Sequence, residues 1–138
     1  MREIYSQLPT ALMLLVGAAA IRWGDRQARA AAGVTALGWI GTLAVQAGAG
    51  SVAGAWGLLA AVDALAFGAF LVLAAKRVRG WIVLVVAAQG VAVAVHLIRA
   101  LAPAMTGWTY LTALAAAGYG VLAALAWGVW SSRRAGQS

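Results

Sequence analysis

The chain consists of five long apolar stretches separated by short polar or glycine-rich connectors, and the stretches cover residues 4–21, 30–47, 56–75, 81–98 and 108–130. A helix that crosses a membrane needs about 20 mostly apolar residues, with a range of roughly 17–25. The strict alternation that marks a half-buried strand is missing, and the many Ala and Leu residues favour helix. The pattern predicts an all-α transmembrane helical bundle of five spans, forming a single integral membrane domain over residues 1–138.

Composition supports a membrane location. Hydrophobic residues make up 64% of the chain and charged residues 9%, whereas soluble domains carry roughly 45–50% apolar and about 25% charged residues. The net charge of +7 would indicate nucleic-acid binding in a soluble protein. Here the basic residues fall between the apolar stretches, so we expect membrane lipid as a partner and no nucleic acid.

Two of the spans have rival interpretations. The second stretch contains Gly33, Gly38 and Gly41, which lower its helix propensity. The first stretch contains "LMLLVGAAA", which is similar to the apolar region and cleavage site of a signal peptide. The preceding segment "MREIYSQLPT" has no clear positive excess, so we interpret this stretch as a span.

The basic residues predict the orientation, because short loops rich in Lys and Arg stay in the cytoplasm. With the N-terminus periplasmic and the C-terminus cytoplasmic, eight basic residues lie inside and two, Arg2 and Arg99, lie outside. The inside set is Arg22, Arg26, Arg29, Lys76, Arg77, Arg79, Arg133 and Arg134. The two sides alternate as five spans require, so we expect a multi-pass membrane protein with this orientation.

Most aromatic residues fall at the expected membrane boundaries, where Trp and Tyr commonly anchor a helix. The inner set is Trp23, Trp81, Trp127 and Trp130, and the outer set is Tyr5, Trp56, Trp108 and Tyr110. Trp39 and Tyr119 are left near the middle of the membrane. We interpret the boundary residues as anchors.

Small residues at four-residue spacing allow helices in lipid to approach closely. Such stripes occur as Ala60, Ala64 and Gly68, as Ala88 and Ala92, and as Ala116, Gly120, Ala124 and Gly128. They predict a tight bundle. Whether they join helices of one chain, a homo-oligomer or a larger membrane complex stays open.

One polar cluster is expected in the periplasmic half. Asp63 lies seven residues inside the third span, roughly 10 Å below its outer boundary. On the fourth span, Gln89 and His96 are seven residues apart and share a face, and Arg99 follows three residues later. Tyr119 and Trp39 lie at about the depth of Gln89.

Burying an ionisable group in a span costs roughly 2.5–3.5 kcal/mol at a helix centre, so Asp63 must be neutral, paired or hydrated. His96 or Arg99 is the expected partner. Two interpretations remain: a pocket for a ligand or a proton, or an interhelical clamp in which Asp63, Gln89 and His96 bond only one another. We expect Tyr119 and Trp39 mainly to pack.

Cofactor chemistry finds little support. One histidine cannot supply two axial haem ligands, and the chain has no cysteine and no spacing typical of zinc. We therefore predict no metal, no cofactor and no enzymatic activity.

The segment from Val62 to Val129, about half of the chain, resembles a group of small, uncharacterised proteobacterial inner-membrane proteins. The matching positions are Asp63, Arg79, Trp81, Gln89, His96, Leu97, Arg99 and Tyr119. The group usually has two aromatics after the basic turn and Trp-Gly before the last Tyr, whereas this chain has Trp81 alone and Ala117–Gly118. The resemblance implies a location in the bacterial inner membrane and supplies no substrate.

The favoured hypothesis is an accessory or binding protein whose pocket takes a small amphipathic ligand, such as a quinone or a lipid headgroup. A structural subunit of a larger complex is the first alternative, with the polar set as a clamp. A small transporter or proton-coupled channel is the second. The scarcity of polar residues in the inner half of the spans argues against transport.

Overall fold

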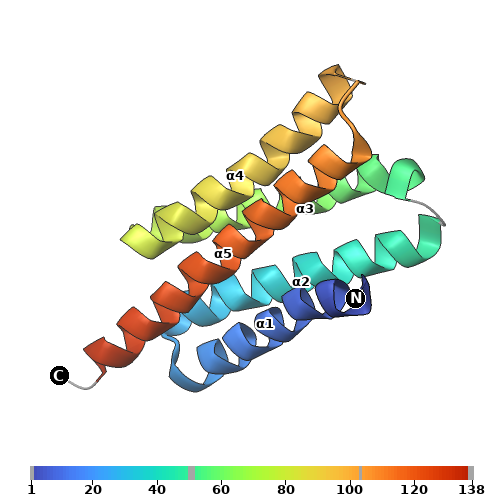
Figure 1. Ribbon diagram of the computed structural model, residues 1–138. Helices are drawn as coiled ribbons and strands as arrows, with labels where there is room; N and C mark the ends of the chain where they lie inside the picture. Colours follow the sequence, from blue (N-terminus) through green and yellow to red (C-terminus); the bar gives the residue numbers. More distant parts are fainter. Residues whose placement is uncertain (1, 50–51, 103, 137–138) are drawn as a thin grey trace.

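The computed structural model describes residues 2–49, 52–102 and 104–136, and these ranges form an all-α bundle (Figure 1). Its helices are α1 (Arg2–Trp23), α2 (Arg26–Ala49), α3 (Val52–Lys76), α4 (Gly80–Leu101) and α5 (Gly107–Ala135). Successive helices run in opposite directions, so α1 begins at one end of the bundle and α5 ends at the other (Figure 1). The prediction of an all-α bundle of five helices is confirmed.

Within the described residues, four helical stretches are long and apolar enough to cross a membrane: Arg26–Gly48, Ala55–Lys76, Gly80–Leu101 and Gly107–Ala135. The apolar part of α1, Leu8–Trp23, is shorter. All five helices extend beyond the predicted spans, because each continues into the residues that flank its apolar stretch. Asp25 starts α2 early, since its Oδ1 accepts a hydrogen bond of 2.9 Å from the Ala28 N–H, as an N-cap does.

The connectors α1–α2 and α3–α4 and the C-terminus of α5 meet at one end, which we call the basic end. Asp25 forms an ion pair with Arg79 there. Gln27 donates from Nε2 to the main-chain oxygens of Leu73 (2.9 Å) and Arg77 (2.7 Å), which tie α2 to the end of α3. These contacts join two segments far apart in the sequence, residues 25–27 and residues 73–79.

The surroundings of Asp25 lower the pKa of its side chain. Partial burial by itself would raise the pKa of Asp25. The hydrogen bond from Ala28, the hydrogen bond and charge of Arg79, and the charge of Arg77 outweigh burial and hold this pKa below its ordinary value. The ionised carboxylate is therefore favoured by the fold.

The tightest packing lies in the half of the bundle next to the basic end. The buried side chains there include Ala20, Ala28, Ala31, Phe70, Val85 and Leu125. Between α4 and α5, a Cβ added at Gly120 would lie 3.1 Å from the Ala88 Cβ, and one added at Gly128 would clash with Trp81. The small-residue stripe of α5 is thus used, at these two positions, to pack helices of the same chain.

The anchoring interpretation needs correction at two aromatics. Trp81 and Tyr110 are buried, because each packs between α4 and α5 rather than facing outward. The other predicted anchors that can be assessed, Trp23, Trp56, Trp108, Trp127 and Trp130, are exposed. The side chain of Tyr5 lies outside the described part of the chain.

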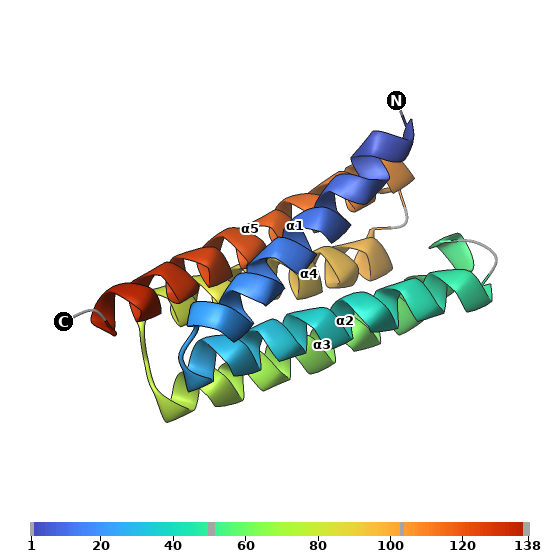
Figure 2. The same ribbon diagram turned by 90° about the horizontal axis from the view of Figure 1, so that it is seen from below.

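Helices α2 and α5 draw apart with distance from the basic end, as both views show (Figures 1 and 2). Helix α4 packs against α3 and α5, while α1 packs against α2 and α5. The bundle is therefore closed at the basic end and splayed at the opposite end, which we call the open end.

Candidate functional site

The predicted polar residues of α3 and α4 meet directly. The Asp63 Oδ1 accepts a hydrogen bond of 2.8 Å from the Gln89 Nε2, and its Oδ2 lies 2.7 Å from the His96 Nε2. Gln89 also donates to the main-chain oxygen of Asp63 at 3.3 Å. Two turns of α4 separate Gln89 from His96, so both side chains project from one face toward α3.

Helix α5 adds Tyr110 to this cluster. The Tyr110 hydroxyl lies 3.0 Å from the His96 Nδ1, and the two rings meet edge to face with centroids 5.6 Å apart. An ionised Asp63 only accepts hydrogen bonds. With a neutral imidazole, the His96 Nε2 then carries the proton, and Nδ1 accepts from the Tyr110 hydroxyl. A hydrogen-bonded chain thus links α5, α4 and α3.

Burial is uneven across these side chains. The side chain of His96 is 3% exposed and that of Asp63 is 28% exposed, while Gln89 is buried. The imidazole therefore stands behind the carboxylate. Asp63 is the member of the trio that remains open to a further contact.

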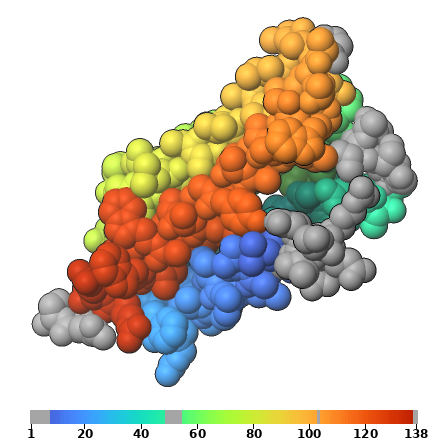
Figure 3. Space-filling view, viewed as in Figure 1, coloured from blue at the N-terminus to red at the C-terminus, as the bar shows by residue number. Residues whose placement is uncertain are grey.

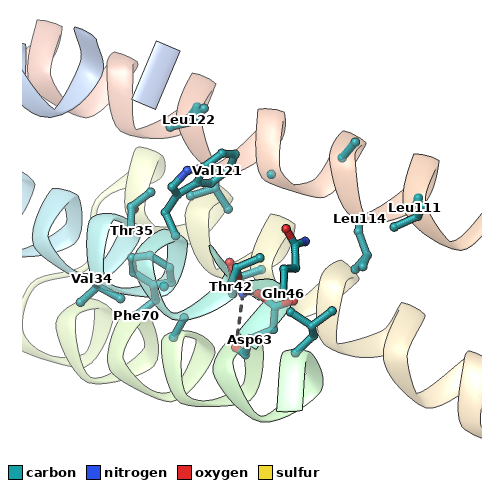
Figure 4. Close-up of a pocket in the computed structure, with 17 residues that line it drawn as sticks. Val34, Thr35, Thr42, Gln46, Asp63, Phe70, Leu111, Leu114, Val121 and Leu122 are labelled. Atoms are coloured by element: carbon teal, nitrogen blue, oxygen red, sulfur yellow. Dashed lines mark hydrogen bonds between the residues drawn. The ribbon is translucent and has the colours of Figure 1, made fainter. Parts of the chain in front are cut away.

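A cleft of about 240 Å³ lies on the exposed side of Asp63. The surface is hollowed between α5 and α2 (Figure 3). Figure 4 shows Thr42 and Gln46 of α2, Asp63 of α3 and Leu114 of α5 around this space. The cleft occupies the region where α2 and α5 have separated, and Phe70 and Val121 of the packed core line its inner end.

Most of the cleft wall is apolar. Its polar lining residues besides Asp63 are Thr35, Trp39, Thr42, Gln46 and Gln89. The Thr35 hydroxyl already donates to the Ala31 main-chain oxygen at 2.9 Å. Among the lining residues, Asp63 is the one with an ionisable side chain.

Two further residues predicted for the site, Trp39 and Arg99, lie in different parts of the structure. Trp39 lines the cleft, but its indole Nε1 is buried without a hydrogen-bond partner, so it offers the cleft an apolar surface. Arg99 donates from Nη1 to the main-chain oxygen of Met105 in the α4–α5 connector.

Tyr119 requires a correction. Its side chain is 39% exposed, and it is not among the residues that line the cleft. Tyr119 lies nine residues after Tyr110, which is two and a half turns at 3.6 residues per turn. The two tyrosines therefore face opposite sides of α5, and Tyr110 takes the place that the sequence assigned to Tyr119.

The sequence does contain a pattern that places Tyr110 in the cluster, but the pattern is its spacing from other residues of α5 rather than its depth. It precedes the buried Ala117, Ala124 and Gly128 by 7, 14 and 18 residues, which are spacings of one helix face. These buried small residues mark the inward face of α5, and Tyr110 lies on it.

No protein-family model, curated protein or solved structure matches the chain. The arrangement of the site therefore carries the functional argument by itself. Chemically, it provides one hydrogen-bonded carboxylate at the wall of a mostly apolar cleft.

Proposed function

We propose that this is a binding protein of the bacterial inner membrane that holds a small amphipathic ligand, such as a quinone or a lipid headgroup, in the cleft between α2 and α5. The observation that carries this proposal is the partly exposed carboxylate of Asp63 in an otherwise mostly apolar cleft. Such sites are typically apolar, with a few placed polar groups that orient the ligand.

The proposed setting has all five helices crossing the membrane. Helix α1 has 22 residues, a length of about 33 Å at 1.5 Å per residue, which matches a hydrocarbon core of about 30 Å. The excess of Lys and Arg at the basic end favours a cytoplasmic position for that end. The open end and its cleft then belong to the periplasmic half.

Asp63 can act both as an interhelical clamp and as part of a ligand pocket, because the two roles use different sides of its carboxylate. The contacts to Gln89 and His96 hold α3 against α4, which supports a structural contribution. The cleft lies between α2 and α5 on the exposed side of the carboxylate, and Gln89 also lines it. The hydrogen bonds to α4 therefore position the carboxylate for binding.

Transport remains the weaker alternative. The half next to the basic end is filled by apolar side chains such as Phe70, Val85 and Leu125, and its close packing favours binding over passage across the membrane.

Filling the cleft tests the proposal. A Cβ at Gly118, which lines the cleft, meets no atom within 4 Å, and the same is true of Gly68, which does not line it. We expect protein purified in mild detergent to retain one quinone or lipid species that mass spectrometry detects. Gly118→Leu should deplete that species severalfold, while Gly68→Leu should retain it.

Circular dichroism and monodispersity establish that both variants fold. Equal amounts of every co-purified molecule in the wild type, Gly118→Leu and Gly68→Leu would contradict a ligand in this cleft.

A further inference from the structure

We infer that the polar end of the ligand is a hydrogen-bond-donating cation, a primary ammonium group that binds Asp63. This inference rests on the proposed function and specifies which amphipathic molecules suit the cleft. It follows from the charge of the cleft, from the hydrogen bonds that Asp63 still offers, and from the size of the space.

The charge in the cleft is one-sided. No Lys, Arg or His is among its lining residues, and Asp63 supplies the one ionisable side chain there. His96 stands behind the carboxylate and is only 3% exposed. A ligand in the cleft therefore meets the acid before it meets any base.

The hydrogen bonds that Asp63 can still form are one-sided as well. A carboxylate accepts at about four positions, and Gln89 and His96 occupy one on each oxygen. The remaining positions accept and cannot donate while the acid is ionised. A quinone carbonyl or a phosphate oxygen is also an acceptor, so neither pairs with Asp63, whereas an ammonium group donates up to three hydrogen bonds.

The apolar wall strengthens this preference. A charge-assisted hydrogen bond between an ammonium and a carboxylate is roughly twice as strong as a neutral one. The wall contributed by Leu59, Phe70 and Leu114 offers neither ion an alternative partner. Pairing compensates part of the cost of holding an ionised Asp63 away from water.

The size of the cleft suits the head of such a molecule. Its volume of about 240 Å³ is below the roughly 300–1,000 Å³ of pockets that enclose a whole drug-sized ligand. The ammonium and the first carbons fit inside, and an alkyl tail continues out between α2 and α5. Both a free long-chain amine and the headgroup of phosphatidylethanolamine carry this chemistry.

The test compares three probes on the full chain in detergent: dodecylamine, dodecanol with the same tail but no charge, and decylubiquinone. We expect dodecylamine to bind the wild type at least tenfold more tightly than dodecanol or decylubiquinone, as measured by isothermal titration calorimetry. Gly118→Leu should abolish this binding, and Gly68→Leu should leave it unchanged.

Asp63→Asn should remove the tenfold advantage of dodecylamine over dodecanol. The amide can still accept from Gln89 and donate to the His96 Nε2, with the imidazole in its other tautomer donating from Nδ1 to the Tyr110 oxygen, so the cluster stays paired. Asp25→Asn, which removes a carboxylate at the basic end, should keep the advantage. The comparison of probes on the wild type does not depend on how well Asp63→Asn folds.

The outcomes separate this inference from the proposed function. Dodecanol or decylubiquinone binding as tightly as dodecylamine, and blocked by Gly118→Leu, would overturn the ammonium inference and leave the binding cleft supported. Failure of all three probes to bind, or binding that Gly118→Leu does not affect, would overturn both. Competition identifies the natural source: displacement of dodecylamine in nanodiscs by phosphatidylethanolamine, but not phosphatidylcholine, supports the lipid, and no displacement by either supports a free amine.

Discussion

The indole ring of Trp81 on α4 lies against Gly128 on α5, so closely that a Cβ atom at residue 128 would come within 2.5 Å of the ring. Gly128→Ala should therefore destabilise the bundle by about 1–3 kcal/mol, the usual cost of overpacking. Unfolding in mixed micelles of increasing dodecyl sulfate content measures the effect. Gly68→Ala, where a Cβ meets no atom within 4 Å, is the matched control and should be neutral or gain up to about 1 kcal/mol. Equal stability of the two variants would contradict the contact.

The two tyrosines of α5 provide a second matched pair. Tyr110→Phe removes the hydroxyl next to the His96 Nδ1 and should cost about 0.5–1.5 kcal/mol of unfolding free energy. Tyr119→Phe, on the exposed side of α5, should leave the stability nearly unchanged. A larger loss of unfolding free energy for Tyr119→Phe than for Tyr110→Phe would contradict the contact between Tyr110 and His96.

Asp63 and His96 should be energetically coupled. Each single variant, Asp63→Ala or His96→Ala, removes the contact of 2.7 Å between the carboxylate and the imidazole. The double variant should then cost less than the sum of the two, with a coupling energy of about 0.5–3 kcal/mol. Unfolding free energies of the four proteins give this value, and strict additivity would show that the contact contributes nothing.

The ion pair at the basic end predicts a dependence on pH. Because the pKa of Asp25 is lower in the folded chain than its ordinary value, its ionisation stabilises the fold. That contribution is fully present above the unfolded pKa of about 3.9 and is lost as the pH falls through the lower folded pKa.

Asp25→Asn isolates this effect, because Asn also caps a helix N-terminus. The stability difference between the wild type and Asp25→Asn should therefore be largest near neutral pH and shrink in acid, as thermal unfolding between pH 2 and pH 7 would show. A difference that grows on acidification would have the opposite sign and would contradict the lowered pKa.

Much of the site could be predicted from the sequence, because the position of a residue along a span gives its depth in the membrane. Antiparallel spans place Asp63, Gln89 and His96 at neighbouring levels, and the seven-residue spacing of Gln89 and His96 gives them one face. The structure brings these three together. The helix starts were harder, since hydropathy marks the apolar core, whereas Asp25 begins α2 within the polar flank.

The other features of the site depend on how each helix is rotated about its own axis. The depth of a residue in its span does not determine that rotation. Tyr119 has the depth of Gln89 but the opposite face of α5 from Tyr110. Trp81 has the boundary position of an anchor, yet Gly128 makes room for its ring inside the bundle. The cleft itself arises from the angle between α2 and α5, which no spacing along the chain encodes.

For the ligand of the proposed function, the splay of α2 and α5 would also determine the route to Asp63. In the proposed membrane setting, a gap between two helices faces acyl chains rather than water, so entry would be sideways, from the surrounding leaflet. Occupancy would then follow the mole fraction of a compound dissolved in the bilayer instead of its aqueous concentration. Diluting the membrane with inert lipid should empty the cleft even when the amount of compound per volume of buffer is unchanged.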